Sequence, residues 1–369
     1  MIQENNYMIN DLATQARREF YPDRVVSCTQ HDHDFLFTCE NGVRLSLQVI
    51  TDKILRFRYA TDGNFTPDFS YALPSDQTRQ PLTLLEFREK ADHYRITTDR
   101  LICTLDKQNL HARILNRSGT VLCEDEKGFH WQYDDETGND LVLMSKQVQS
   151  GVCYYGLGDK PANMNLRGQR FTNWGTDTYG YVKGSDPLYK NVPFYLELQQ
   201  KIAHGIFFDN SFKSQFDFAA ERADVTSFWA QGGEMNYYFL YGPTLLEVVE
   251  DYTRLTGPPE LPPLWALGYH QCKWSYFPES QFRGIANGFR ERQIPCDALY
   301  LDIDYMDGYR CFTWSPTHFP DPKRWCRTWP RMGSRPLSSS TPASRLTPPT
   351  PCTSRGWKTT TSAAAPTAR

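Results

Sequence analysis

Residues from about 20 to 242 alternate between hydrophobic and polar side chains in many short runs. In residues 43–49, VRLSLQV, the two kinds alternate one by one, which is the period of a strand with one buried face. Turn signals such as Asn41-Gly42 separate the runs. The pattern predicts strands at 34–39, 43–51, 54–60, 101–106, 141–147, 194–199, 202–209 and 235–241. Such a series favours an antiparallel β-sandwich, although a β-barrel would give the same pattern.

The pattern changes after Pro243. Residues 244–255 carry apolar side chains three or four positions apart and predict a helix, and the prolines between 258 and 263 form a stiff connector. Beyond the connector we expect a strand at 265–269, a helix at 279–292 and a strand at 298–302. That order predicts one βαβ unit with parallel strands. The chain therefore divides into an N-terminal segment (1–20), a β-rich domain (21–257) and the start of an α/β domain (258–327).

Residues 328–369 differ from the rest of the chain. They are rich in Ser, Thr, Pro and Arg without apolar periodicity, and none of the 43 Asp and Glu residues lies after Asp321. A segment of this composition cannot bury enough apolar surface to offset its ordering entropy, so we expect it to be disordered. It is either a natural Ser/Pro-rich linker or, as we favour, out-of-frame translation that begins near residues 323–328.

Composition narrows the functional classes. The net charge of −3 gives no electrostatic reason to expect nucleic acid or an anionic membrane as a partner. The sequence contains no stretch of about 18 apolar residues, so no membrane span is predicted. The polar first twenty residues lack an apolar signal region, so a cytoplasmic location is expected. The ten cysteines form no CxxC pair, which disfavours a zinc site, and we expect no metal or cofactor.

The sharpest candidate for chemistry is the pair Asp302 and Asp304, at the end of the second predicted parallel strand. Parallel α/β folds bind ligands at the carboxyl ends of their strands, and a carboxylate there can hold sugar hydroxyls by charge-assisted hydrogen bonds. Two other interpretations remain open. The acids can cap the following turn, or they can form the Asp-x-Asp metal motif of a nucleotide-sugar transferase. An EF-hand loop is excluded because Met306, Asp307 and Thr313 occupy positions that need an oxygen ligand, Gly and Glu.

A second candidate is the segment 154–195, which interleaves Gly and Asn with Tyr, Trp and Phe and shows little strand pattern. A loop of that length inside a domain is usually functional, and flat aromatic rings can pack on the apolar faces of sugars. The rings can equally well attach the loop to the sandwich. Trp274, just after the first predicted parallel strand, can line the same pocket as Asp302. The run from His31 to Asp34 is interpreted as a solvated turn.

Three motifs in register resemble glycoside hydrolase family 31, the family of α-glucosidases and α-xylosidases. They are YYGLGDKPANMNLRG with its continuation to residue 194, PPLWALGYHQCKWSY (262–276) and LDIDYMDGYRCFTW (301–314). The resemblance covers roughly residues 20–325. It implies a galactose-mutarotase-like antiparallel β-sandwich followed by the first βαβ unit of a (β/α)8 TIM barrel. It also implies hydrolysis of a terminal α-linked glucose with retention of configuration, on an oligosaccharide or α-glucoside substrate.

The same resemblance implies roles for four residues. Asp302 corresponds to the barrel carboxylate that binds hydroxyls of the terminal sugar, and Ile303 lies beside it. Trp274 matches the aromatic position that walls this subsite. Asp177, in the segment 154–195, matches a residue that reaches from the sandwich over the barrel mouth toward the sugar.

The chain also departs from the family pattern. A retaining glycosidase needs two carboxylates about 5–5.5 Å apart, and in this family both come from later barrel strands. No W-x-D-M-N-like nucleophile motif occurs here, so no catalytic residue is assigned. We expect an incomplete barrel and a chain that hydrolyses nothing. The alternatives are a non-catalytic carbohydrate-binding protein and, less favoured, a metal-dependent glycosyltransferase.

Overall fold

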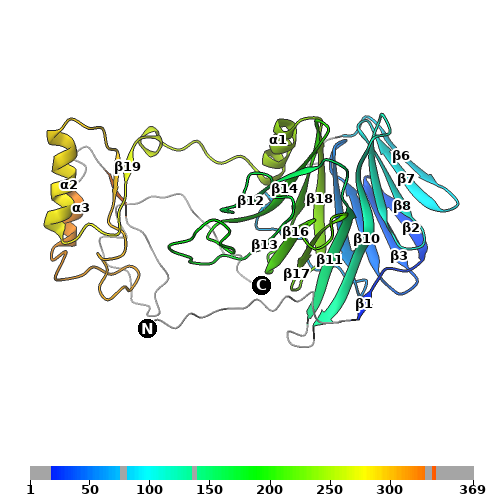
Figure 1. The fold of residues 1–369 in the computed structure, drawn as a ribbon, viewed down its shortest axis with the longest axis horizontal. Coiled ribbons are helices and arrows are strands. Elements are labelled where there is room, and N and C mark those ends of the chain that lie inside the picture. Colours follow the sequence, from blue (N-terminus) through cyan, green and yellow to red (C-terminus); the bar gives the residue numbers. More distant parts are fainter. Residues whose placement is uncertain (1–17, 75–80, 135–138, 329–334, 338–369) are drawn as a thin grey trace. The chain divides into compact units, whose positions relative to one another are not determined.

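The computed structural model describes residues 18–74, 81–134, 139–328 and 335–337. The chain divides between Pro258 and Pro259 into two compact units (Figure 1). The first unit is almost entirely β, and the second combines helices with a small parallel sheet.

Two antiparallel sheets form the first unit. In its described residues, the larger sheet has ten strands. Their order is β13 (Gln169–Asn173), β16 (Ser214–Phe218), β17 (Val225–Ala230), β11 (Asn139–Gln147), β10 (Val121–Asp134), β9 (Ala112–Asn116), β8 (Leu101–Asp106), β7 (His93–Thr98) and β6 (Leu85–Glu89), with β1 (Glu19–Phe20) also paired to β10. The second sheet has eight strands in the same part of the chain. Their order is β12 (Cys153–Gly158), β14 (Asn191–Gln199), β15 (Ile202–Phe208), β18 (Met235–Gly242), β5 (Ile54–Ala60), β4 (Arg44–Val49), β3 (Asp34–Cys39) and β2 (Val25–His31). The two separate sheets confirm the antiparallel β-sandwich and not the β-barrel.

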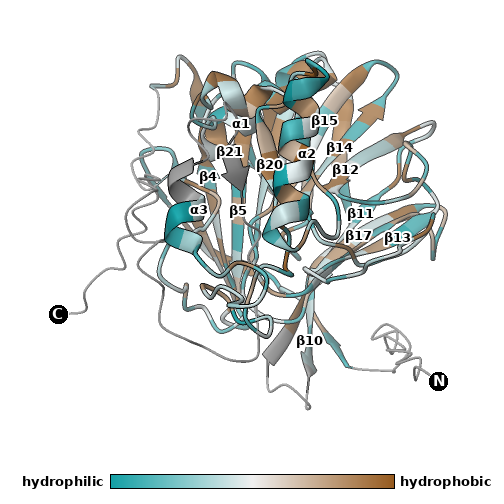
Figure 2. Ribbon diagram, turned by 90° about the vertical axis from the view of Figure 1, so that its left-hand side faces the viewer, coloured by the Kyte–Doolittle hydropathy of each residue, from teal (hydrophilic) through white to brown (hydrophobic). Residues whose placement is uncertain are grey.

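The core of this unit lies between the two sheets. Along β4 the side chains of Leu45, Leu47 and Val49 are fully buried, while the intervening residues are not, as the alternating pattern predicts. Figure 2 shows the same alternation of hydropathy on other strands. Aromatic rings fill much of the core, and Phe57 of β5 stacks on Tyr237 of β18 with ring centroids 4.9 Å apart.

Charged side chains are also buried in the sandwich. Lys146 and Asp125 form an ion pair at 2.7 Å, with both side chains at most 2 % exposed. His204 lies 3.6 Å from the Glu197 carboxylate, and both are buried. Buried charges are tolerated when each has an opposite charge or hydrogen bonds at hand.

The segment 154–195 differs from its sequence prediction. It holds most of β12, all of β13 and the start of β14, so the irregular parts are the connection 159–168 and the loop 174–190. Glycines mask this strand pattern. Gly156 and Gly158 of β12 have positive φ, and a Cβ at either position would lie 2.5 Å from a backbone oxygen of the neighbouring chain segment.

One helix, α1 (Leu245–Thr256), packs on the eight-stranded sheet. Thr244 caps its first turn in a reciprocal capping box with Glu247, which stabilises the helix start. Val248 and Leu255 are buried against Phe194 and Phe207 of the sheet. The helix predicted at 244–255 is therefore confirmed within one residue.

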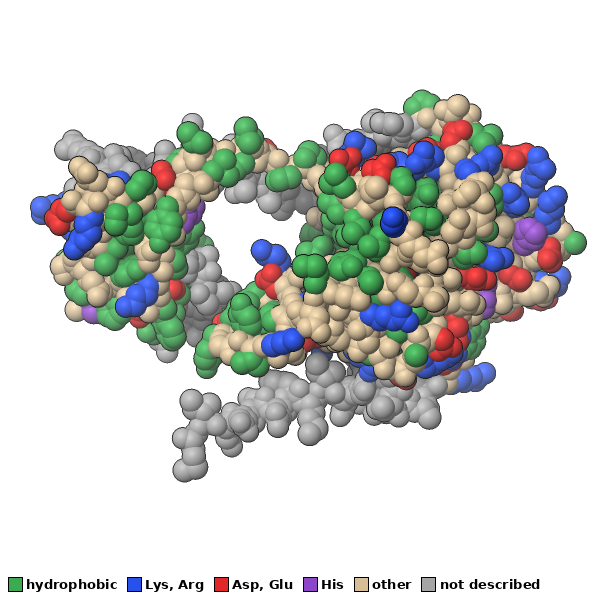
Figure 3. All heavy atoms as spheres, turned by 45° about the horizontal axis from the view of Figure 1, so that its top comes forward, with side chains coloured by type: hydrophobic (Ala, Val, Ile, Leu, Met, Phe, Trp, Pro, Cys, Tyr) green, Lys and Arg blue, Asp and Glu red, His purple; other side chains and the backbone are tan. Residues whose placement is uncertain are grey.

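The second unit begins with a correction. The strand predicted at 265–269 is wrong: the chain forms a 3-10 turn, η2 (Leu264–Leu267), in which the Ala266 N–H donates to the Pro263 carbonyl at 2.9 Å. Leu264 and Leu267 are 85 % and 65 % exposed, so their apolar character did not signal burial. Figure 3 shows hydrophobic side chains at the surface of this unit.

A three-stranded parallel sheet follows in the described residues. Strand β19 (His270–Gln271) pairs with β20 (Ala298–Tyr300), and β20 pairs with β21 (Arg335–Leu337). The helices α2 (Glu279–Glu291) and α3 (Pro322–Thr328) lie between consecutive strands along the chain, and their Phe282 and Trp325 rings share a core with Leu299 of β20.

A βαβ unit is thereby present, with β19 at 270–271 in place of the strand predicted at 265–269, but β21 was not expected. It falls inside the segment 328–369, for which we predicted no regular structure. Its pairing with β20 is long-range and leaves no local pattern in a run that contains Pro336. Residues 329–334 and 338–369 lie outside the described residues, so the expectations of disorder and of a changed reading frame stay predictions.

Candidate functional site at the ends of two parallel strands

Asp302 lies just beyond the carboxyl end of β20. The strand ends at Tyr300, and the chain turns sharply at Asp302, which has a φ of 58°. Partial burial, and then the charge of Asp304, raise the pKa of the Asp302 carboxyl, while the Ile303 N–H partly offsets them. The carboxylate is half-buried, so a ligand can reach it. A carboxylate in this setting holds hydroxyl groups well, because few waters compete for its oxygens.

Asp304 is held more tightly than Asp302. One of its oxygens accepts a hydrogen bond from the Ser275 hydroxyl, and the other accepts one from the Tyr309 hydroxyl at 3.1 Å. The first of these bonds links the turn after β20 to the turn after β19. Asp304 thus fixes the loops, and Asp302 is the carboxylate that remains for a ligand.

Trp274 and Ile303 have different surroundings. The Trp274 side chain is 72 % exposed and precedes Ser275, whose hydroxyl bonds to Asp304. Its ring is therefore available beside the turn that carries Asp302. Ile303 is half-buried and packs against the hydrophobic core of the second unit. The structure thus brings Asp302, Ile303 and Trp274 to one end of the small sheet, while their contacts with a sugar stay predictions.

Asp177 belongs to the first unit. It is exposed on the loop 174–190, and the Tyr189 hydroxyl donates a hydrogen bond to it. The loop is anchored by Lys160, whose ammonium group donates to the Asp186 carboxylate at 2.8 Å and to the Thr172 carbonyl at 2.6 Å. A role for Asp177 at the same sugar as Asp302 stays a prediction.

Two further expectations concern metals and membranes. The run from His31 to Asp34 forms the turn between β2 and β3, with the His31 and Asp32 side chains 92 % and 84 % exposed. Within the described ranges, no three His, Cys, Asp or Glu side chains gather as a metal site would require. In the same ranges, no helix combines the length and the apolar character needed to cross a bilayer. The cytoplasmic location stays a prediction.

The fold and the family comparisons agree on the class of protein. A β-sandwich followed by parallel β/α elements, with a carboxylate and an aromatic ring at the strand ends, is an arrangement found in glycoside hydrolases. The family model “Glycosyl hydrolase 31 N-terminal galactose mutarotase-like domain” matches residues 44–217, and “Glycosyl hydrolases family 31 TIM-barrel domain” matches residues 259–356. The chain belongs to glycoside hydrolase family 31. The second match extends past residue 328, into the segment for which we expected an out-of-frame origin.

Relatives with known activities support this assignment. The chain is 34 % identical over 329 residues to alpha-glucosidase 2 of Bacillus thermoamyloliquefaciens, a match that covers 88 % of this chain and 40 % of the relative. It is 32 % identical over 200 residues to the alpha-xylosidase XylQ of Lactiplantibacillus pentosus, covering 52 % and 25 %. The solved structure of a family 31 dextranase of Flavobacterium johnsoniae, complexed with isomaltotriose, superimposes with a TM-score of 0.78 at 31 % identity, covering 87 % and 39 %. The chain thus spans about two fifths of the length of two of these relatives.

Several site residues escaped the sequence analysis. Ser275 and Tyr309 orient Asp304, and Lys160 anchors the loop that carries Asp177. No local pattern could have identified them, because each acts through a partner that is 5 to 29 positions away in the chain.

Proposed function

We propose that this chain carries the sugar-binding half of an α-glucosidase-type active site. In this proposal, the complete active site releases terminal α-linked glucose with retention of configuration, and this chain supplies the part of it that binds the sugar. Asp302 accepts hydrogen bonds from two hydroxyls of that sugar, Trp274 packs on its apolar face, and Asp177 adds a contact from the first unit. The observation that carries the proposal is the half-buried Asp302 carboxylate at the carboxyl end of β20, with the exposed Trp274 ring in the neighbouring turn.

The proposal divides recognition from bond cleavage. Asp304 accepts hydrogen bonds at both of its carboxylate oxygens, so it is a poor candidate for a nucleophile or a general acid beside Asp302. The sequence after Asp321 holds no acidic residue that could complete a pair. Because retaining hydrolysis needs two carboxylates across the scissile bond, the 369-residue chain binds the sugar without cleaving it.

A binding assay and an activity assay on the full 369-residue chain test both parts. In ligand-observed NMR, methyl α-glucoside should bind with a millimolar Kd, and methyl β-glucoside should bind more weakly. Incubation with p-nitrophenyl α-glucoside should release p-nitrophenol no faster than buffer does. Equal binding of the two anomers would contradict the proposed substrate class, and release well above buffer would contradict the division of roles.

A further inference from the structure

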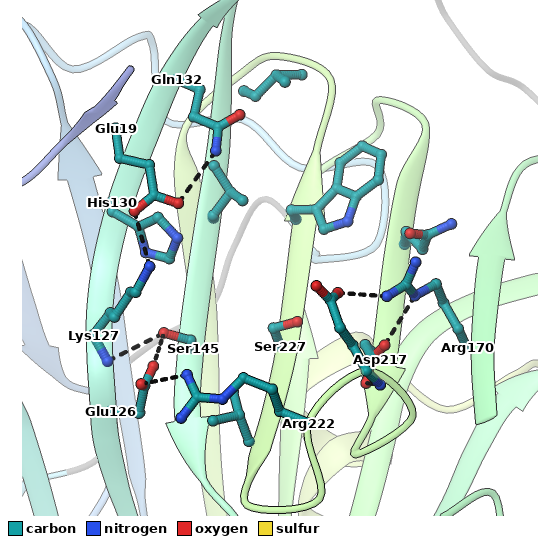
Figure 4. A pocket seen from close by; sticks show the side chains of 16 residues that line it. Glu19, Glu126, Lys127, His130, Gln132, Ser145, Arg170, Asp217, Arg222 and Ser227 are labelled. Atoms are coloured by element: carbon teal, nitrogen blue, oxygen red, sulfur yellow. Dashed lines mark hydrogen bonds and ion pairs between the residues drawn. The ribbon is translucent and has the colours of Figure 1, made fainter. Parts of the chain in front are cut away.

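The outer face of the ten-stranded sheet carries a hollow of about 190 Å³ (Figure 4). Its lining comes from β1, β10, β11, β13, β16 and β17, and from the turns between them. Because strand side chains alternate, the lining residues are those that do not face the core: on β10, His130 and Gln132 face the hollow while Phe129 packs in the core. A single water needs about 10–15 Å³ of such space, so the hollow has room for a small molecule.

Part of the lining is apolar. Leu141, Leu143 and Val225 contribute aliphatic surface, and Trp229 of β17 adds an indole ring that is only half-buried. An aromatic ring at the wall of a pocket offers a flat surface on which a ligand ring can pack.

Each of the three cations that line the hollow is paired with at least one of its four carboxylates. Lys127 pairs with Glu19 at 2.9 Å, and Arg222 pairs with Glu126 at 2.8 Å. On the opposite side, Arg170 bonds to Asp217 at 2.9 Å and to Glu221 at 2.6 Å (Figure 4). An ionic ligand would have to break one of these pairs, whereas a neutral ligand can use the carboxylate lone pairs that the ion pairs leave over.

Neutral hydrogen-bonding groups lie among these pairs. Ser227 and the Gln132 and Gln215 amides line the hollow, and Gln215 is 8 % exposed. His130 is 5 % exposed, and its Nδ1 lies 3.0 Å from the Gly128 carbonyl, so Nδ1 donates and Nε2 is left as an acceptor. Burial lowers the pKa of His130, which keeps the ring neutral at pH 7. The hollow therefore offers neutral donors and acceptors beside cations that are all paired with carboxylates.

We infer that this hollow is a second carbohydrate-binding site, which lies wholly in the first unit and takes one neutral sugar ring. A pyranose has an apolar face for Trp229 and hydroxyls that both donate and accept for Gln215, Ser227 and His130. A phosphate or an acidic peptide would lack a free cation here, and an aliphatic ligand would make no hydrogen bonds with the amides and the Ser227 hydroxyl. The inference stands on the hollow's own residues and does not depend on the proposed function.

The test uses the full chain and separates the two sites. Glucose is titrated by ligand-observed NMR into Asp302→Ala, which removes the carboxylate of the other site, and into Asp302→Ala with Ser227→Tyr, which fills the hollow. We expect Asp302→Ala to retain glucose binding and the double variant to lose it at least tenfold. If Asp302→Ala alone abolishes all binding, the second site is overturned while the proposed function survives.

Two variants of Trp229 show whether a loss of binding comes from the site or from unfolding. Tyrosine is favourable in a strand, so Ser227→Tyr should melt within a few degrees of the parent chain. Trp229→Ala removes the ring without filling the space, and Trp229→Phe retains part of the stacking surface. The site requires that Trp229→Ala weaken glucose binding more than Trp229→Phe does, with both variants folded by circular dichroism. Equal glucose binding by these two variants would overturn the assignment.

Discussion

The ammonium group of Lys160 lies 2.8 Å from the Asp186 carboxylate, and the Lys160 side chain is only 2 % exposed. Asp186 also accepts the Thr172 N–H at 2.5 Å. Strand β13, the segment that follows β12 and the loop 174–190 are thereby joined at one buried point. This link helps to hold the loop that carries Asp177, together with the hydrogen bond from the Thr178 hydroxyl to the Pro187 carbonyl.

Replacing Lys160 by Met should release the loop 174–190. The lost bonds are charge-assisted and worth about 1.5–3 kcal/mol, so the open population of the loop should rise roughly ten- to a hundredfold. Limited proteolysis measures this rise as faster cleavage between residues 174 and 190. Lys183→Met, on an exposed lysine of the same loop, is the matched control. Equal cleavage rates in the two variants would remove Lys160 as the anchor.

The stability of the sandwich should depend on pH through His204. Burial alone lowers the pKa of His204, but the nearby Glu197 carboxylate outweighs it and raises the pKa from 6.5 to about 9. A raised pKa in the folded state means that the stabilisation is complete below pH 6.5 and is lost as the pH rises through 9. At about 1.4 kcal/mol per pKa unit, the free energy of unfolding should fall by up to about 3 kcal/mol over this window.

Urea denaturation across this pH range tests the His204 assignment. In Glu197→Gln the carboxylate charge is gone, so the loss of stability between pH 6.5 and 9 should shrink markedly. His31→Gln, which changes an exposed histidine of the β2–β3 turn, should keep the parent's profile. An undiminished slope in Glu197→Gln would show that another group is responsible.

Gly205 of β15 allows α1 to approach the sheet closely. A Cβ at this position would lie 2.7 Å from the Phe194 ring and 2.8 Å from a Val248 methyl group. Gly205→Ala should therefore destabilise the first unit by about 1–3 kcal/mol through overpacking. Gly175→Ala, where the nearest atom is 3.9 Å away, should change the free energy of unfolding by less than about 0.5 kcal/mol. A difference below about 0.5 kcal/mol between the two variants in urea denaturation would refute the steric account.

Local alternation was enough to predict much of the sandwich. The strands at 34–39, 54–60 and 101–106 have the bounds of β3, β5 and β8. In β3 and β8 burial alternates with a period of two, whereas every residue of β5 is buried although its sequence alternates. Whether those strands form a sandwich or a barrel depends on long-range pairing, which the pattern does not contain. The choice required the order of strands in the two sheets.

The elements and residues that the sequence did not predict also depend on contacts that the local pattern does not contain. The apolar run at 265–269 resembles a strand, yet the chain forms a turn there, because the Ala266 N–H donates a hydrogen bond to the Pro263 carbonyl three residues earlier. Strand β21 exists through its pairing with β20. At the site, Asp302 could be found because two acids after a strand are a local signal. Ser275 and Tyr309, which donate hydrogen bonds to Asp304, could not be found, because only the folded loops bring them to that carboxylate.

The central claim is that Asp302 holds a sugar at the end of β20. Its most direct test compares two carboxylates that flank this strand. Asp302→Asn and Asp297→Asn remove a charge at the carboxyl and amino ends of β20, respectively. Methyl α-glucoside is titrated into each folded full-length variant by ligand-observed NMR with Trp229→Ala in the background, so that the hollow on the large sheet does not contribute. The account predicts at least a tenfold loss of affinity for Asp302→Asn and none for Asp297→Asn. Unchanged affinity in Asp302→Asn would contradict it.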